Sequence, residues 1–301
     1  MMKVLVTGAT GYVGSAVVDA LLAAGHAVSG LARSEGSARE LADRGVSVVM
    51  GDVTDAGSIE GAARDAEAVV HAATTHGPDA EAADRTAVGA ILRALEGTGR
   101  TFVYTSGAWV MGDTPEGVEL ADEETPIDPT PMLAWRPPVE REVLGARSRG
   151  VRAFVVRPAL VYGAGGGVVD ELVGWARERG AGRFVAPPGG EPSWTLVHRD
   201  DLGDLYALLL ASELVGGTLL VAAGDGPHAA RDVAAAASRA AGASDRAEPW
   251  PLDEAREELG DYADALALDQ RLSSERARRT LGWAPSAPTV FDELRDGSYG
   301  P

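Results

Sequence analysis

The first half of the chain alternates short apolar runs with longer stretches in which apolar residues recur at helical spacing. The apolar runs predict strands that are covered on both faces, at residues 3–7, 27–31, 46–50, 68–71, 101–105 and 152–157. Helices are predicted between the runs, among them 12–24, 80–95 and 139–149. This alternation predicts an α/β fold with a Rossmann-type doubly wound parallel sheet.

Glycine and proline become frequent after the fifth predicted strand. Four prolines among acidic residues in the segment 113–131 predict a long loop. Further helices are predicted at 168–179 and 201–212, a Gly/Pro-rich stretch up to residue 192, a strand at 218–222, and helices from there to the carboxyl end. We expect two units: residues 1–160 with most of the sheet, and residues 161–301 forming mainly a smaller lobe interleaved with it.

A glycine motif joins the first predicted strand to the first predicted helix, because residues 7–14 read Thr-Gly-Ala-Thr-Gly-Tyr-Val-Gly. In such a turn Gly8 permits the tight bend, Gly11 lets the backbone approach a pyrophosphate, and Gly14 lets the helix lie close to the sheet. Free N–H groups at the helix start can then bind phosphate. The motif predicts a dinucleotide site in the 1–160 unit, with a substrate lobe in 161–301. The other motif residues assigned to this site are Thr10, Tyr12 and Val13.

The end of the second predicted strand indicates which dinucleotide binds. NAD sites usually have an acidic residue there for the ribose 2′-hydroxyl, whereas this chain has Ala32-Arg33-Ser34. The guanidinium of Arg33 can bind a 2′-phosphate and Ser34 can add a donor, so NADP is favoured over NAD. The alternative is that Arg33 is a solvated surface residue and Glu35 faces the ribose.

Composition narrows the classes of partner. The net charge of −18 disfavours nucleic acid and anionic membranes, and no apolar run is long enough to span a bilayer. The chain has no cysteine, and its five histidines show no ligand spacing, so we expect no metal site. The start runs directly into the first strand, which favours a cytoplasmic protein. One lysine among 27 basic residues is typical of a GC-rich bacterial genome.

Seven short strings occur in a characteristic order along the chain. They are 7–14 (TGATGYVG), 51–55 (GDVTD), 71–73 (HAA), 104–107 (YTSG), 156–163 (VRPALVYG), 197–202 (VHRDDL) and 281–285 (LGWAP). Together they resemble the extended short-chain dehydrogenases/reductases, the epimerase/dehydratase group. The resemblance covers nearly the whole chain and implies a dinucleotide cofactor, a small-molecule substrate and the ability to form a homodimer.

The resemblance also implies roles for individual residues. Asp52 and Val53 would flank the adenine, Ala72 and Ala73 would pack on the dinucleotide, and Pro158 would close over the nicotinamide. Asp52 can instead cap a turn or a helix. For His71, at the end of the fourth predicted strand, we expect burial with one satisfied ring nitrogen in preference to a catalytic role.

This chain matches the family's fold motifs better than it matches the family's catalytic residues. The family uses a Ser or Thr after the fifth strand and a Tyr-x-x-x-Lys pair on the next helix. Here the first position falls on Gly107, one residue after Ser106, and the pair falls on Met132 and Arg136. The only lysine of the chain is Lys3. Two prolines after Arg136 fit the first turn of a helix, so we expect the helix to begin near Arg136.

The candidates for chemistry are therefore few. Ser106, Arg136, Tyr162 and His198 can donate to or hold a reacting group, although each can also have a purely structural role. Three tryptophans in predicted ligand loops can form an aromatic wall or simply pack: Trp109, Trp135 and Trp194.

Three functions fit this pattern. The first is an atypical NADP-dependent oxidoreductase acting on a small carbonyl or conjugated substrate. The second is a non-redox isomerase, cyclase or lyase on the same fold. The third is a non-catalytic dinucleotide-sensing binding protein.

Overall fold

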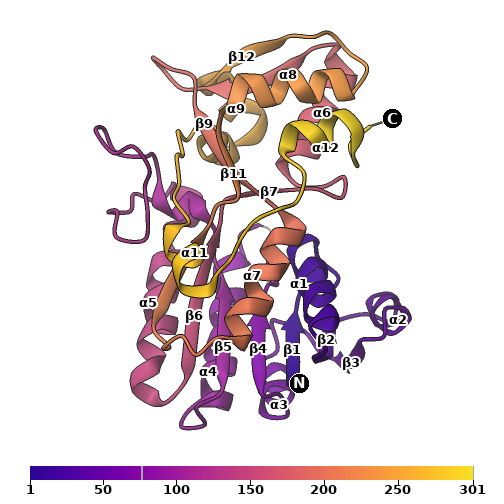
Figure 1. The fold of residues 1–301 in the computed structure, drawn as a ribbon, viewed down its shortest axis with the longest axis vertical. Coiled ribbons are helices and arrows are strands. Elements are labelled where there is room, and N and C mark those ends of the chain that lie inside the picture. Colours follow the sequence, from indigo (N-terminus) through magenta and orange to yellow (C-terminus); the bar gives the residue numbers. More distant parts are fainter. Residues whose placement is uncertain (76, 301) are drawn as a thin grey trace.

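The computed structural model describes residues 1–75 and 77–300, so His76, one of the five histidines, and Pro301 lie outside the described part. Seven parallel strands form one sheet in the order β10-β6-β5-β4-β1-β2-β3 (Figure 1). They are β1 (Lys3–Thr7), β2 (Ala27–Ala32), β3 (Ser47–Met50), β4 (Ala68–His71), β5 (Thr101–Thr105), β6 (Arg152–Pro158) and β10 (Thr218–Ala222). The strand order reverses between β1 and β4. Their carboxyl ends therefore open onto the crevice where doubly wound sheets bind ligands.

Helices cover both faces of this sheet. One layer contains α1 (Tyr12–Ala23), α2 (Glu35–Asp43) and α7 (Arg199–Ala211), and the other contains α3 (Ala56–Arg64), α4 (Ala80–Leu95) and α5 (Arg136–Gly145). Successive side chains of a strand point to opposite faces. Val4 and Val6 therefore join the core under the first layer, while Leu5 joins the core under the second. Because both faces are covered, the central strands β1, β4 and β5 are buried over nearly their whole length, whereas the edge strand β3 is largely exposed.

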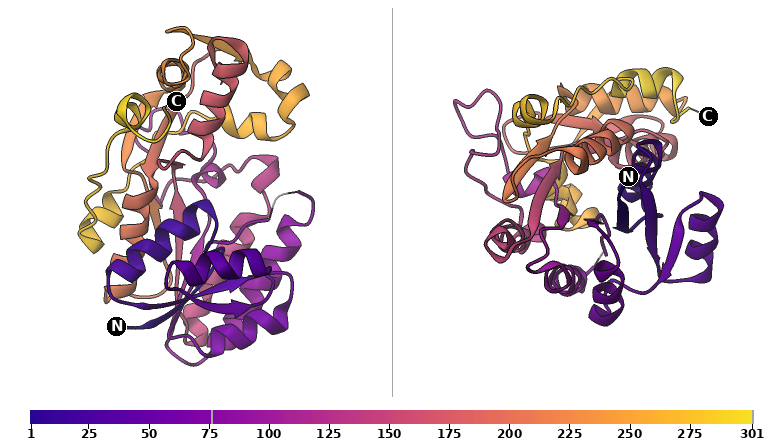
Figure 2. Two further views of the ribbon diagram at one scale, coloured as in Figure 1. Left: turned by 90° about the vertical axis from the view of Figure 1, so that its right-hand side faces the viewer. Right: turned by 60° about the horizontal axis from the view of Figure 1, so that its bottom comes forward.

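A smaller lobe stands at the carboxyl ends of the strands (Figure 2). It holds a three-stranded sheet of β7 (Leu160–Tyr162), β9 (Ser193–His198) and β11 (Asp225–Ala229), and a pair formed by β8 (Gly182–Ala186) and β12 (Ala247–Pro251). Helices α6 (Val168–Arg179), α8 (Ala230–Ala240) and α12 (Val290–Asp296) share one core in this lobe. The remaining helices are α9 (Leu252–Leu259), α10 (Tyr262–Leu266) and α11 (Glu275–Leu281).

The predicted fold class is confirmed: the chain has a Rossmann-type doubly wound parallel sheet and a smaller carboxy-terminal lobe. The lobe is interleaved with the sheet, because α7 and β10 return to the sheet after β9. Two predictions for the lobe were wrong. The Gly/Pro-rich stretch contains β8, and the segment after β10 contains β11 and β12 besides helices. The partners β8 and β12 are far apart in sequence, so no local pattern indicates that they pair.

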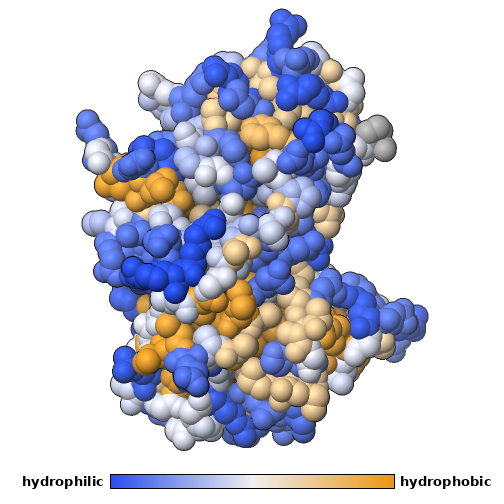
Figure 3. Space-filling model, in the orientation of Figure 1, coloured by the Kyte–Doolittle hydropathy of each residue, from blue (hydrophilic) through white to orange (hydrophobic). Residues whose placement is uncertain are grey.

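The surface differs between the two ends of the molecule. On the face seen in Figure 1, hydrophilic side chains dominate over the smaller lobe, whereas apolar and weakly apolar ones gather over α7 and α1 (Figure 3). Leu208 of α7 and Val215 beyond it are 37% and 56% exposed. Among the helices of residues 1–75 and 77–300, none combines the length and the apolar character needed to cross a bilayer.

Candidate functional site

The glycine motif bends the chain so tightly that two of its glycines have no room for a side chain. Gly8 has a φ of 71°, and a Cβ atom there would lie 2.6 Å from the Cα of Ala73. A Cβ at Gly14 would lie 2.0 Å from the carbonyl oxygen of Gly8. The turn closes through a hydrogen bond from Gly11 N–H to Gly8 O of 2.8 Å, and α1 begins directly afterwards. The backbone therefore has the form that close approach of a phosphate requires.

At the end of β2 the side chain of Arg33 is exposed and makes no ion pair with any described residue. The Ser34 hydroxyl caps α2 by accepting from Ser37 N–H at 3.2 Å. Glu35 pairs with Arg39 one helical turn later, at 3.2 Å. Arg33 is thus the residue of this group that remains open to a ligand, while Ser34 and Glu35 have local partners.

Of the predicted adenine and dinucleotide contacts, Ala72 and Ala73 lie beside the glycine motif, whereas Asp52 and Val53 follow β3. The carboxylate of Asp52 accepts from the N–H and the hydroxyl of Thr54, at 2.8 and 2.7 Å. These hydrogen bonds hold the pKa of Asp52 below its ordinary value. Asp52 therefore fixes a turn, which is the structural role considered from the sequence. Ala73 and Val53 line a small cavity of about 10 Å³ behind the motif, and Ala72 N–H donates to Thr7 O at 3.2 Å.

A cavity of about 620 Å³, called the main cavity below, lies beside the glycine motif, where the carboxyl ends of β4, β5 and β6 meet the starts of α5 and α6. Its size suits a small-molecule site, and its lining is mostly apolar. The lining residues are Tyr12, Val13, Thr74, Thr75, Gly77, Pro78, Ala80, Glu81, Thr105, Ser106, Gly107, Ala108, Trp109, Met132, Leu133, Trp135, Arg136, Pro158, Ala159, Leu160, Val161, Gly167 and Val168. Of the predicted catalytic residues, Ser106 and Arg136 are among them.

Ser106 presents an unused donor to the main cavity. It follows β5 directly, and its N–H donates to Val156 O at 2.8 Å, which fixes its backbone. The side chain is buried, yet its Oγ has no hydrogen-bond partner among the described residues. Because buried hydroxyls normally have partners, the unpartnered Oγ makes Ser106 the candidate donor to a substrate oxygen.

Arg136 begins α5, as the two prolines after it predicted. Its Nη1 donates to the carbonyl oxygen of Thr105 at 3.3 Å and to the hydroxyl of Tyr104 at 3.4 Å. Its guanidinium carbon lies 4.8 Å from the centre of the Trp135 ring, so the cation also rests on an aromatic face. The side chain is thus fixed from two sides, and among the described residues that line the main cavity it is the one with a basic side chain.

A buried polar chain continues behind Arg136. The Tyr104 hydroxyl donates to Asp84 Oδ2 at 2.9 Å, and His71 Nε2 lies 3.4 Å from Asp84 Oδ1. His71 Nδ1 is 2.7 Å from the hydroxyl of Thr7, so one nitrogen of this histidine is satisfied, as expected from the sequence. Burial raises the pKa of Tyr104 well above its ordinary value, which keeps the phenol neutral. This series of buried polar contacts therefore links β1, β4, α4 and β5 to the Arg136 guanidinium at the main cavity.

Two of the three predicted tryptophans line the main cavity, namely Trp109 and Trp135. Trp194 does not. It is buried in the core of the smaller lobe, and its indole N–H donates to Leu266 O at 3.2 Å. It lies on β9, whose side chains alternate between the lobe core and its other face, and the sequence does not indicate which side this residue takes.

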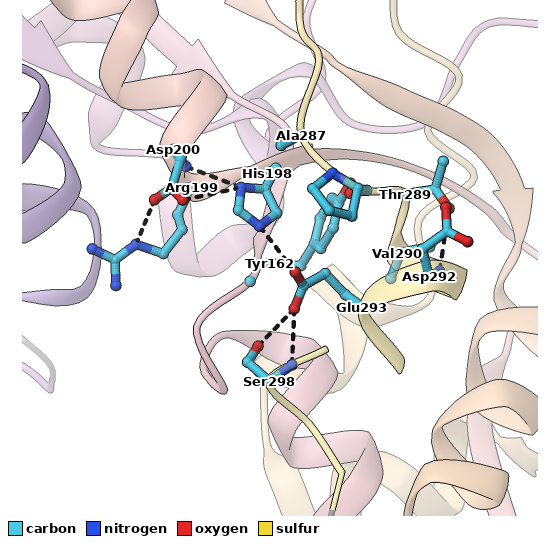
Figure 4. Close-up of polar contacts among 12 residues, drawn as sticks. Tyr162, His198, Arg199, Asp200, Ala287, Thr289, Val290, Asp292, Glu293 and Ser298 are labelled. Atoms are coloured by element: carbon cyan, nitrogen blue, oxygen red, sulfur yellow. Dashed lines mark hydrogen bonds and ion pairs between the residues drawn. The ribbon is translucent and has the colours of Figure 1, made fainter. Parts of the chain in front are cut away.

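Tyr162 and His198 also lie away from the lining of the main cavity. The buried Tyr162 hydroxyl donates to Pro288 O at 2.8 Å. His198 Nδ1 accepts from Asp200 N–H at 3.2 Å and so caps α7, and its Nε2 lies 3.6 Å from Glu293 Oε1 (Figure 4). Both side chains therefore hold residues 288–299, called the carboxy-terminal segment below, in place. Tyr162 is a candidate because of its position at a strand end, and His198 because an imidazole can act as an acid, but β7 and β9, which carry them, belong to the second sheet.

Several cavity residues were not expected from the sequence. Thr74 and Thr75 lie just after the carboxyl end of β4. Their position after a predicted strand could have indicated that they line a ligand site. Leu133 belongs to the short turn before α5, for which only the prolines give a signal. Asp84 lies inside a helix and has no sequence signal. The part of the chain that the structure describes holds no group of three or more residues able to bind a metal ion.

Known proteins share this architecture and sequence. Residues 4–222 match the model of the NAD dependent epimerase/dehydratase family. An uncharacterized protein of Schizosaccharomyces pombe is 31% identical, over 99% of this chain and 100% of that protein. The 3-diazoavenalumate denitrifying reductase of a Streptomyces species is 31% identical, over 97% and 99%. Thermus thermophilus UDP-glucose 4-epimerase, in complex with NAD, superposes with a TM-score of 0.77 at 25% identity, over 98% and 99% of the two chains. This chain therefore belongs to the NAD dependent epimerase/dehydratase family.

Proposed function

We propose that the protein is an NADP-dependent oxidoreductase that reduces a small carbonyl or conjugated substrate in the main cavity. The observation that carries the proposal is the buried Ser106 hydroxyl, which lines this cavity without a partner among the described residues. The fixed guanidinium of Arg136 lines the same cavity. Two donors at an apolar cavity beside a glycine motif suit a substrate oxygen that gains negative charge.

The residues present fit a dinucleotide. Side chains at Gly8 or Gly14 would fill the space against Ala73 and the Gly8 carbonyl, so this backbone is kept bare for a close approach. Bound there, the reduced nicotinamide would supply the hydride. Arg33, exposed and unpaired in the described part of the chain, favours NADP through its charge. The substrate-binding lobe would be residues 161–301 and the dinucleotide-binding domain residues 1–160.

The chain's own residues must then polarise the carbonyl. Ser106 Oγ–H and the Arg136 guanidinium would donate to the substrate oxygen and stabilise the alkoxide that forms when hydride reaches the carbon. Arginine keeps its protons in proteins, so it can stabilise but not protonate the product. Tyr162 and His198 are engaged elsewhere, and we assign the proton to solvent water. The proposed site thus works without the Tyr-x-x-x-Lys pair of the family.

The name of one relative agrees with this proposal, since the Streptomyces protein that matches nearly the whole chain is a reductase. The non-redox and sensor functions have no feature of the cavity in their favour, and they become outcomes of the test. A homodimer also remains a proposal, for which the mass of the protein in solution is the measurement.

The test begins with titration of the purified protein with NADPH and NADH, followed by tryptophan quenching. We expect NADPH to bind more tightly. Arg33→Ala should weaken NADPH binding about tenfold and leave NADH binding nearly unchanged, because a charge-assisted hydrogen bond to the 2′-phosphate is lost. Arg39→Ala, one turn along and paired with Glu35, is the matched control.

Each outcome has a distinct meaning. Binding of neither dinucleotide by the wild-type protein would overturn the proposal, and an unchanged preference in Arg33→Ala would remove Arg33 from the site. Consumption of NADPH with one member of a panel of carbonyl and conjugated compounds would support it. A product at the oxidation level of its substrate, without NADPH consumption, would indicate the isomerase, cyclase or lyase function. A tight nucleotide-dependent protein complex without turnover would indicate a sensor.

A further inference from the structure

The five residues after β7, Gly163 to Gly167, form a loop at the edge of the main cavity, called loop 163–167. Four of its residues have a positive φ: 103° at Gly163, 52° at Ala164, 66° at Gly165 and 74° at Gly167. Positive φ is accessible to glycine but costly for alanine. Because glycines also order poorly by themselves, this loop needs contacts from outside to keep one shape.

Tyr299, close to the carboxyl end of the chain, supplies such contacts. Its hydroxyl accepts from Gly163 N–H at 2.6 Å and donates to Gly166 O at 2.7 Å, so one phenol holds both ends of the loop. Burial raises the pKa of Tyr299 to about 12, so the phenol stays neutral and can both donate and accept. The neighbouring Ser298 hydroxyl accepts from Gly165 N–H at 2.8 Å.

The segment that carries Tyr299 is itself anchored to the lobe. Glu293 of α12 accepts from the N–H and the hydroxyl of Ser298, at 3.1 and 2.7 Å (Figure 4). The other carboxylate oxygen of Glu293 lies 3.6 Å from His198 Nε2, at the start of α7. The backbone next to Tyr299 is therefore anchored independently of its contacts with the loop.

On its other side, loop 163–167 packs on the glycine motif. The Tyr12 hydroxyl donates to Gly163 O at 2.7 Å. A Cβ at Gly166 would lie 2.6 Å from the Tyr12 ring, and one at Gly167 would lie 3.1 Å from it, so the loop covers the ring closely. Tyr12, Gly167 and Val168 all line the main cavity. The loop therefore reaches the main cavity at Gly167, next to the Tyr12 ring of the glycine motif.

We propose that Tyr299 is a positioning residue, whose hydroxyl holds loop 163–167 against Tyr12 and so keeps the dinucleotide side of the main cavity in its binding shape. This role rests on the proposed function, because it acts through dinucleotide binding. The carboxy-terminal segment is then part of the site although none of its described residues lines the main cavity.

The test compares two tyrosine variants of the full-length protein. Tyr299→Phe removes only the hydroxyl that holds the loop. Tyr162→Phe removes another buried hydroxyl that holds the same segment at Pro288 but makes no hydrogen bond to the loop. Hydrogen–deuterium exchange of a peptide covering residues 163–167, the affinity for NADPH and the thermal midpoint are measured for both. Ser298→Ala, which removes one loop contact and the hydroxyl's hydrogen bond to Glu293, is the second variant if Tyr299→Phe does not fold.

We expect Tyr299→Phe to speed exchange in the loop and to weaken NADPH binding roughly tenfold, because the binding-competent loop becomes less populated. Tyr162→Phe should keep wild-type exchange and affinity, even where its thermal midpoint falls equally. Ser298→Ala should change both readouts in the same direction as Tyr299→Phe. Equal NADPH affinity in the two tyrosine variants would overturn the positioning role and leave the proposed function standing. Failure of the wild-type protein to bind NADPH would overturn both.

Discussion

At the scale of single residues, the proposed site depends on two donors that face the main cavity with different restraints. Arg136 is held by Thr105 O, the Tyr104 hydroxyl and the Trp135 ring, whereas Ser106 is held only through its backbone. The guanidinium therefore offers a fixed charge and the hydroxyl an adjustable hydrogen bond. The proposed function requires both to be directed at the same substrate oxygen.

Replacing Ser106 tests this arrangement. Ser106→Ala removes the unpaired Oγ and should lower kcat about 100-fold with the substrate that consumes NADPH, as removal of one oxyanion donor does. NADPH affinity should stay within twofold, because the hydroxyl faces the substrate. Ser148→Ala, whose exposed hydroxyl donates to Gly145 O, is the control. A fall in NADPH affinity with unchanged kcat would assign Ser106 to the cofactor instead.

At the scale of elements, local patterns predicted the main sheet well and the lobe poorly. The strands at 3–7, 68–71 and 101–105 match the structure to the residue, because each is one short, mostly apolar run. β8 carries a glycine and an arginine and β12 carries two prolines, so neither is a continuous apolar run, and the two strands pair with each other in parallel. Their assignment depends on a contact between distant segments, which a local pattern does not carry.

The same distinction applies to the candidate site. Ser106 directly follows the end of β5, and Arg136 begins a helix whose first turn contains two prolines. Both residues line the main cavity. Tyr162 and His198 are the last residues of β7 and β9, but these strands belong to the second sheet, where their ends meet the carboxy-terminal segment. Sequence indicates that a residue ends a strand. Which sheet the strand joins depends on tertiary packing.

One ion pair joins the elements that carry the site. Glu140 of α5 accepts from Arg157 of β6 at 3.0 and 2.5 Å, and both side chains are buried. Glu140→Gln leaves the guanidinium without its carboxylate and should destabilise the fold by about 3 kcal/mol. Glu142→Gln, exposed on the same helix, should change stability by less than about 0.5 kcal/mol. Urea denaturation measures both, and equal midpoints would show that the pair contributes nothing.

At the scale of the whole molecule, the carboxy-terminal segment is docked through carboxylates as well as through Tyr299. Asp225 accepts from Val290 N–H at 2.7 Å and lies 2.7 Å from His228 Nε2. Burial alone would raise the pKa of Asp225, but the contacts with His228 and Val290 hold it below the ordinary 3.8. Burial likewise opposes the Ser298 contacts at Glu293, and its pKa too lies below the ordinary value. The segment that fixes loop 163–167 is therefore docked by contacts that favour the charged form of the Asp225 and Glu293 carboxyl groups.

The sign of the pH dependence follows. A carboxyl group with a lowered pKa in the folded state stabilises the fold above its unfolded value, and this contribution disappears as pH falls through the folded value. We expect Asp225→Asn to lower the thermal midpoint by a constant amount above about pH 5, and the difference from wild type to shrink as pH falls below about 4. Thermal unfolding of both proteins from neutral to acidic pH measures it. A difference that stays constant down to the lowest pH would mean that the charge of Asp225 does not stabilise the docked segment, and the docking would then depend on neutral hydrogen bonds such as those of Tyr299 and Tyr162.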